Sequence, residues 1–237
     1  MRFFADKQQI EAGTLANEDV KHLKDVMRAK VGEKFTLCDG EQNDYICEIT
    51  TLEKNSVSYD ILEQYKNENE PSVKITLFQG LPKSHKMELI IQKAVEIGIT
   101  EIVLVETTRS VVKIKGEEKK LERWQKISRS AAMQSRRGII PAVRYAKFSE
   151  LKKATAGFDL NLIAYENERE QTLKRVLQSE HMKPTSIAIY IGPEGGFTEE
   201  EVEAITDKGH SVSLGKRILR TETAALVMAS QLLYELE

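Results

Sequence analysis

The sequence predicts an α/β protein in which a mostly parallel sheet, covered by helices, follows a smaller β-rich unit. From residue 73 onward, short apolar runs alternate with longer runs in which apolar residues recur at helical spacing. Residues 1–70 instead alternate polar and apolar side chains in short runs separated by turn residues. Residues 65–72 are polar, contain Pro71, and form the predicted linker. The predicted domains are therefore 1–70 and 73–237.

The N-terminal domain is expected to be a small β-barrel, closed only in part, with one helix. The helix is capped by Asn17 or Asp19, runs through Met27 and ends before Gly32. The strands are predicted over residues 2–4, 33–38, 45–53 and 56–62.

The C-terminal domain is expected to alternate strands with helices, a pattern typical of a parallel sheet with both faces covered. Ser84 caps its first helix and Gly98 stops it. The strands are predicted over residues 73–79, 102–105, 160–164, 187–191 and 212–214. The later helices are predicted over residues 116–136, 173–178, 199–208 and 222–236.

Composition favours a folded cytoplasmic protein with no membrane span and no metal. Hydrophobic residues make up 41% of the chain and charged residues 30%, which is ordinary for a globular protein. The longest apolar stretches are far too short to cross a bilayer, and the N-terminus does not have the pattern of a secretory signal. Cys38 and Cys47 are expected to be reduced thiols, the alternative being a disulfide across a hairpin. The four histidines lack the spacing of metal ligands.

Positive charge is concentrated in one part of the chain. Residues 109–147 hold twelve Lys and Arg against three acidic residues, although the whole chain has a net charge of −2. A basic stretch on an otherwise acidic protein indicates an anionic polymer as partner. The alternative is a solvated, salt-bridged helix face. Arg136 and Arg137, beside Gly138, lie near the end of the predicted helix and favour the first interpretation.

Ligands of open α/β sheets bind beyond the carboxyl ends of the strands, and three such ends stand out. They are residues 164–166, 191–197 and 214–220. The second packs three glycines around a proline, which lets the backbone approach a ligand closely. The helix after it begins at Thr198 with three glutamates, which would repel a phosphate at the helix N-terminus.

These loops therefore suit a phosphate-free ligand that is read by backbone groups and tolerates nearby carboxylates. S-adenosylmethionine, with its adenosine and its cationic sulfonium, fits that description. The alternative is that the glycine-rich turns are only tight connections between strands and helices. Two such loops close together in the sequence favour a binding site.

The same loops carry a family resemblance. The strings IGPEGGF at 191–197 and LGKRILRTETA at 214–224 resemble the signature of the SPOUT methyltransferases. More closely, they resemble the ribosomal RNA small subunit methyltransferase E family. Segments 22–28, 93–98, 109–111 and 132–141 resemble further parts of that family in the same order. Met27 stands where leucine is common in the family.

The resemblance implies a PUA-like RNA-binding barrel followed by a SPOUT domain whose C-terminal segment forms a trefoil knot that holds S-adenosylmethionine. It also implies a homodimer that methylates N3 of a uridine in 16S ribosomal RNA, with the assembled small subunit as the expected substrate. A knot would not have been predicted from the sequence pattern, because knots are very rare among folds.

The cofactor-binding residues are expected at the three strand ends. They are Ala164, Tyr165, Glu166, Ile191, Gly192, Glu194, Gly195, Gly196, Leu214, Gly215, Ile218, Leu219 and Arg220.

Methylation at N3 of uracil requires loss of a proton and stabilisation of negative charge on the uracil oxygens. Arginine side chains suit the second task, and Arg136 and Arg137 are the first candidates, with Arg109 and Arg220 behind them. In the N-terminal domain, Arg2 and Arg28 are expected to contact RNA phosphates, and Arg109 is also assigned to RNA binding.

Three carboxylates are candidates for proton acceptor or for orienting the cofactor: Glu166, Glu194 and Glu222. Glu222 is assigned to the catalytic set with the two arginines. Each of the three could equally be a helix-cap or turn residue.

Three other functions stay open on the sequence alone. The same fold could methylate a ribose 2′-hydroxyl or a guanosine. A non-catalytic RNA-binding assembly factor would use the basic stretch and the barrel equally well. An enzyme acting on nucleoside triphosphates is opposed by the absence of a phosphate-binding lysine motif and by the acidic helix start.

Overall fold

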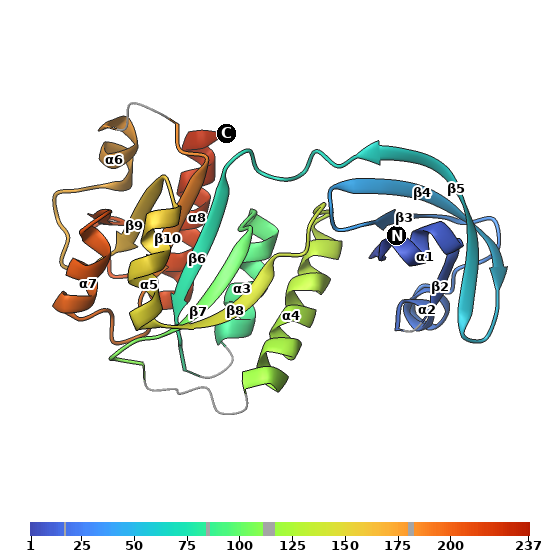
Figure 1. The fold of residues 1–237 in the computed structure, drawn as a ribbon, viewed down its shortest axis with the longest axis horizontal. Coiled ribbons are helices and arrows are strands. Elements are labelled where there is room, and N and C mark those ends of the chain that lie inside the picture. Colours follow the sequence, from blue (N-terminus) through green and yellow to red (C-terminus); the bar gives the residue numbers. More distant parts are fainter. Residues whose placement is uncertain (17, 84–85, 111–116, 180–182) are drawn as a thin grey trace. The chain divides into compact units, whose positions relative to one another are not determined.

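The computed structural model describes the chain except residues 17, 84–85, 111–116 and 180–182 (Figure 1). The predicted cap residues Asn17 and Ser84 therefore lie outside the described residues. The chain forms two compact units, the first made of Met1–Glu70 and Ala132–Ile140, the second of Pro71–Ala131 and Pro141–Glu237. The segment Ala132–Ile140 was expected in the C-terminal domain, whereas its contacts are with the first unit.

The first unit is built on a five-stranded sheet in the order β1-β3-β4-β5-β2. β1 is parallel to β3, and the other pairs are antiparallel. Phe35 and Tyr59 meet edge to face at 5.5 Å within its core. The strands are β1 (Arg2–Phe4), β2 (Thr14–Ala16), β3 (Lys34–Cys38), β4 (Asn43–Leu52) and β5 (Ser56–Lys66).

The sequence prediction missed a helix and a strand here, α1 (Lys7–Ala12) and β2. The signals for α1 were present: Asp6 and Gln9 form a capping box, and Gly13 closes the helix with a φ of 62°. The predicted helix 19–27 is shorter in α form. It consists of α2 (Glu18–Lys21) and then a π-helical turn, His22–Val26.

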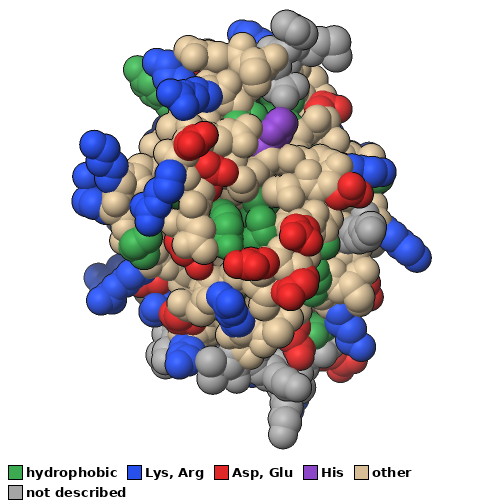
Figure 2. Space-filling view, turned by 90° about the vertical axis from the view of Figure 1, so that its left-hand side faces the viewer, with side chains coloured by type: hydrophobic (Ala, Val, Ile, Leu, Met, Phe, Trp, Pro, Cys, Tyr) green, Lys and Arg blue, Asp and Glu red, His purple; other side chains and the backbone are tan. Residues whose placement is uncertain are grey.

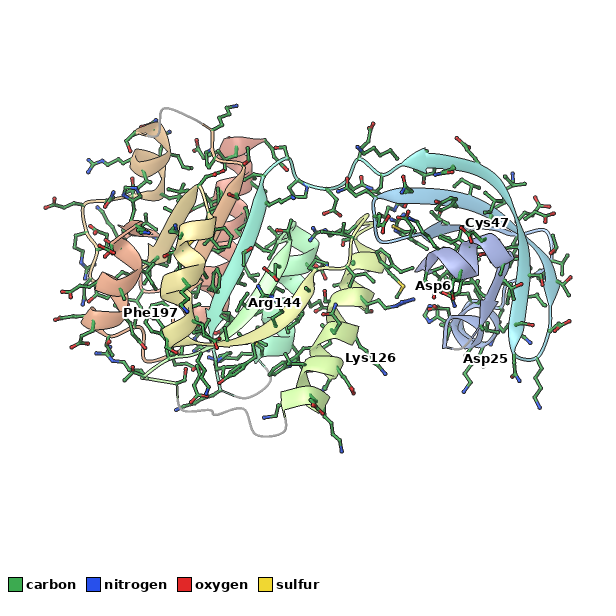
Figure 3. The ribbon with its side chains drawn as sticks, in the orientation of Figure 1. Asp6, Asp25, Cys47, Lys126, Arg144 and Phe197 are labelled. Carbon is green, nitrogen blue, oxygen red and sulfur yellow. The ribbon has the colours of Figure 1, made fainter. Side chains whose placement is uncertain are left out.

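Both cysteines of the first unit are buried free thiols on strands β3 and β4. Figure 3 marks Cys47 inside this unit. Burial raises the pKa of Cys38 and of Cys47 to about 12, so both stay protonated near neutral pH. The disulfide considered from the sequence is therefore not formed.

A buried network of charges binds the segment Ala132–Ile140 to the rest of the first unit. The Arg2 guanidinium donates to both carboxylate oxygens of Asp44, at 2.6 and 2.8 Å, and to the backbone oxygen of Arg137. The Arg137 guanidinium pairs with Glu70, whose Oε1 also accepts the backbone N–H of Gly138 at 2.8 Å. Burial alone would raise the pKa of Asp44, but hydrogen bonds from Arg2 and Asn67 lower it.

The second unit contains a six-stranded parallel sheet in the order β11-β9-β10-β6-β7-β8, which confirms the predicted α/β class. The trefoil knot stays a prediction. The strands are β6 (Lys74–Gly80), β7 (Glu101–Glu106), β8 (Ala142–Lys147), β9 (Leu160–Ala164), β10 (Ser186–Ile191) and β11 (His210–Val212). The helices are α3 (Lys86–Ile97), α4 (Glu117–Gln134), α5 (Phe148–Ala154), α6 (Leu173–Ser179), α7 (Glu199–Thr206) and α8 (Thr221–Leu236).

Helices cover both faces of this sheet, as predicted (Figure 1). On one face Phe78 stacks on Tyr190 with 4.7 Å between ring centroids, beneath α5 and α7. Phe197, labelled in Figure 3, belongs to the same cluster. α3 and α8 pack against each other and against the sheet on the other face. Gly98 ends α3 with a φ of 128°, and a Cβ there would lie 2.7 Å from Pro71.

Several boundaries differ from the prediction. β8 and α5 were missed because residues 138–150 carry mixed polar and apolar side chains without a clear period. β5 continues to Lys66, so the first two residues of the expected linker belong to a strand. Among the described helices, none combines the length and apolar character that a bilayer crossing requires.

Candidate functional site

A cavity of about 420 Å³ opens at the carboxyl ends of β9, β10 and β11 in the second unit. Its volume is within the range of about 300–1,000 Å³ that is usual for small-molecule sites. Because the three strands are parallel and adjacent, the loops that leave their carboxyl ends converge on this cavity.

The cavity is lined by every predicted cofactor-binding residue except Gly195. The lining residues that the sequence prediction missed are Lys86, Pro193, Phe197, Val212, Ser213, Arg217, Thr221 and Ala224. Most of these are neighbours of predicted residues. Lys86 comes from a fourth strand end, after β6, which the same rule about parallel strands would have included.

Two glycines of the loop after β10 are required by close approach. Gly196 has a φ of 67°, and a Cβ on it would lie 2.5 Å from Oε1 of Glu166. A Cβ on Gly192 would lie 3.0 Å from the backbone of Gly196. The turn is closed by the backbone N–H of Gly196, which donates to the oxygen of Pro193 at 2.9 Å. Glycine is therefore needed for the shape of this wall.

Lys86 joins two of the candidate carboxylates. Its Nζ lies 3.1 Å from Oε1 of Glu194 and 3.2 Å from Oε2 of Glu222. Hydrogen bonds to Glu194 and then to Glu222 raise the pKa of Lys86. Partial burial opposes ionisation of Glu194, but its own backbone N–H, Lys86 and the N–H of Lys83 lower its pKa. The side chain of Glu222 is 16% exposed and does not line the cavity, so it reaches the site through Lys86.

A buried hydrogen-bond chain fixes the start of α8 at the cavity. The Gln79 side chain, fully buried at the end of β6, donates from Nε2 to Oγ1 of Thr221 at 2.8 Å. Oγ1 of Thr221 in turn donates to the backbone oxygen of Gly192 at 2.6 Å. This chain holds α8 against the glycine loop, so the loops from β10 and β11 keep a fixed spacing.

Arg109 lies on the outer side of the same glycine loop. Its side chain is exposed, and Nη1 donates to the backbone oxygen of Gly195 at 3.0 Å. A Cβ on Gly195 would lie 3.1 Å from Cβ of Arg109. Gly195 thus faces Arg109 instead of the cavity, which explains why it is missing from the cavity lining.

The other nominated arginines belong to the first unit, and the structure separates them into two kinds. Arg2 and Arg137 are committed to the buried network described above, with 10% and 3% of their side chains exposed. We therefore revise both predictions, because these guanidinium groups already satisfy internal carboxylates. Arg28 and Arg136 are exposed, have φ values of 53° and 61°, and show no side-chain partner among the described residues.

Side chains in Figure 2 show what surrounds one face of the second unit. Acidic groups gather around an exposed apolar area there, and most Lys and Arg groups lie toward the edges. On the exposed side of α4, by contrast, Lys119, Lys120, Arg123 and Lys126 follow one another, and Arg123 pairs with Glu88 at 2.7 Å. Where the chain is described, no three His, Cys, Asp or Glu side chains converge as metal ligands do.

Residues 68–233 match the family described as RNA methyltransferase domain, and residues 15–62 match the RNA methyltransferase PUA domain. Ribosomal RNA small subunit methyltransferase E of Bacillus subtilis (strain 168) is 38% identical over 248 residues, covering 100% of this chain and 97% of that protein. The protein of the same name from Mesomycoplasma hyopneumoniae (strain 232) is 33% identical, with 97% of each chain covered.

Solved structures show the same likeness along nearly the whole chain. The Ribosomal RNA small subunit methyltransferase E of Neisseria gonorrhoeae, bound to S-adenosyl methionine, superposes with a TM-score of 0.86 at 32% identity, covering 99% of this chain and 97% of that one. A putative methyltransferase from Legionella pneumophila, in complex with the bound cofactor SAM, gives a TM-score of 0.86 at 30% identity and the same coverage.

Proposed function

We propose that this chain, which belongs to the ribosomal RNA small subunit methyltransferase E family, methylates N3 of a uridine in 16S ribosomal RNA. Family membership carries the coarser statement that it is an S-adenosylmethionine-dependent methyltransferase of small-subunit ribosomal RNA. The choice of N3 and of uridine rests on the resemblance of the two glycine strings and on the chemistry argued below.

The observation that carries the proposal is the cavity at the three strand ends. Its walls are largely loop backbone, which suits the adenosine part of the cofactor. The carboxylates of Glu166 and Glu194 line it, and they suit a ligand with a positive sulfonium and ammonium group. The helix that follows the glycine loop starts with three glutamates, so a triphosphate is disfavoured there.

S-adenosylmethionine supplies an electrophilic methyl group when bound in this cavity. The protein must hold the uracil N3 in line with that group, remove the N3 proton and stabilise the charge left on the uracil oxygens. Glu166 is the cavity carboxylate with the most exposed side chain and is placed to orient the cofactor or accept a proton. Glu222 acts in this proposal by holding Lys86 at the cavity.

The RNA is assigned to exposed cations. Arg28 and Arg136 in the first unit, and Arg109 in the second, have exposed side chains that can reach a phosphate or a base oxygen. The exposed cations on α4 add to the positive surface, which supports an RNA partner for the basic stretch. The homodimer implied by the family resemblance is part of the proposal, and light scattering of the purified protein checks it.

The proposed function is tested by adding the protein and labelled S-adenosylmethionine to small ribosomal subunits from a strain that lacks it. We expect mass spectrometry of the digested 16S RNA to find 3-methyluridine at one site. A 2′-O-methyl nucleoside or a methylated guanosine would instead establish a different chemistry on the same fold. If calorimetry detected no S-adenosylmethionine binding, the chain would be an RNA-binding assembly factor. Binding of ATP in its place would establish the triphosphate enzyme.

Replacing Arg136 with alanine should separate RNA chemistry from cofactor binding. We expect the affinity for S-adenosylmethionine to change less than about twofold, because Arg136 does not line the cavity. We expect kcat to fall about a hundredfold, as for loss of one charge-stabilising donor. Arg28→Ala is the matched control, since Arg28 is also exposed with a positive φ and should raise KM for RNA with kcat retained. Unchanged turnover in Arg136→Ala would remove Arg136 from the mechanism.

A further inference from the structure

Glu201, in the first turn of α7, is a buried carboxylate with two separate backbone partners. Its side chain belongs to a residue that is 4% exposed. Oε2 accepts the backbone N–H of Thr198 at 3.0 Å, which completes a capping box with the hydroxyl of Thr198. Oε1 accepts the backbone N–H of Thr108 at 2.8 Å, a residue in the loop after β7. A helix cap needs only the first of these bonds.

The bond to Thr108 joins two loops that the sheet itself does not join. β7 and β10 are not neighbours, since β6 lies between them in the sheet. The loop after β10 therefore has to pass over the end of β6. There a Cβ on Gly80 would lie 2.5 Å from Pro193, so only glycine lets the two loops come so close. Glu201 then reaches the loop after β7 from the far side of that crossing.

A second bond links the same two loops. Arg109 follows Thr108 directly, and its Nη1 donates to the oxygen of Gly195 at 3.0 Å. The loop after β7 is itself a rigid turn, because the hydroxyl of Ser110 accepts the N–H of Thr107 at 3.1 Å and the oxygen of Thr107 accepts the N–H of Ser110 at 3.1 Å. A rigid turn held at two points moves together with the glycine loop.

We propose that Glu201 is a positioning residue that fixes Arg109 relative to the cofactor cavity, so that RNA held by Arg109 is aligned with the methyl group. This rests on the proposed function, in which Arg109 contacts the RNA. The anchoring carboxylate is ionised and buried, and each of its oxygens has one backbone donor among the described residues. Such a paired acceptor is strong and directional. Misplacement of a reacting group by about 1 Å can lower a rate about a hundredfold.

Glu201→Gln is the direct test, because an amide offers one acceptor and would turn its –NH2 toward one of the two N–H groups. We expect kcat for RNA methylation to fall about ten- to a hundredfold, while the Kd for S-adenosylmethionine changes less than about threefold. Two variants separate this role from helix capping. Thr198→Ala removes the hydroxyl half of the cap, and Glu199→Gln removes an exposed charge from the same turn. Both should keep kcat near that of the wild type.

A double-mutant cycle with Arg109→Met decides how Glu201 acts. If Glu201 works by holding Arg109, the double variant should have about the same kcat as Arg109→Met alone. Should Glu201→Gln fail to fold, Glu201→Asp takes its place, since it keeps the charge but is one methylene too short to reach both amides. Losses that multiply in the double variant, unchanged kcat in folded Glu201→Gln, or a parallel loss of cofactor affinity would each overturn the proposal. Absence of any wild-type methylation would instead refute the proposed function.

Discussion

Replacing Gly196 with valine is expected to weaken the binding of S-adenosylmethionine by about a hundredfold, equivalent to about 2.8 kcal/mol. Gly196 has a φ of 67°, which a β-branched residue adopts only with strain. The new Cβ would also lie 2.5 Å from Oε1 of Glu166 and 3.2 Å from its Cδ. Either Glu166 or the glycine loop must move, and both line the cavity. Calorimetric titration of the folded variant with S-adenosylmethionine measures the loss.

Gly157→Val is the control for this experiment. Gly157 lies outside the cavity, has no positive φ, and a Cβ there meets no atom of the described structure within 4 Å. Its cofactor affinity should equal that of the wild type. Wild-type affinity in Gly196→Val would show that the loop after β10 does not form the cofactor site, and the proposed function would lose its main support.

Replacing Arg137 with alanine is expected to lower the free energy of unfolding by about 3–5 kcal/mol. The side chains of Arg137 and Glu70 are 3% and 8% exposed, and they pair with each other inside the first unit. Removal of the guanidinium leaves the Glu70 carboxylate buried without its cation, although it keeps the N–H groups of Gly138 and Ile139. Urea unfolding followed by circular dichroism measures the change.

Arg136→Ala provides the matched comparison for stability, because the two arginines are adjacent and differ in burial. Arg136 is exposed, so its removal should change the free energy of unfolding by no more than about 0.5 kcal/mol. Equal losses in the two variants would contradict the structural role of Arg137. A sharp loss of turnover in Arg137→Ala at full stability would restore it to the catalytic candidates.

Local patterns were sufficient to predict the parallel sheet and the cofactor loops. The apolar runs at β9 and β10 are bounded by turn residues, so strand positions and carboxyl ends could be read directly. Because parallel strands share one edge, the loops at 164–166, 191–197 and 214–220 had to meet there. The cavity lining follows from that argument, with Gly195 as the exception.

The roles of individual charged residues depended on tertiary contacts between distant parts of the chain. In sequence, Arg136 and Arg137 are equivalent, yet only Arg137 meets Glu70, 67 residues away. Likewise Lys86 becomes part of the cavity because Glu194 and Glu222 are brought to it by two other loops.

The sequence by itself determined the α/β class, the strand ends that form the cavity, and the family. The reason is that periodicity, glycine positions and turn residues act over a few neighbouring residues. Tertiary structure alone decided that 132–140 joins the first unit, that Arg2 and Arg137 are internal, and that Glu201 connects two loops. Whether a charged side chain is buried against a carboxylate or exposed to solvent depends on contacts across the fold, which no local pattern encodes.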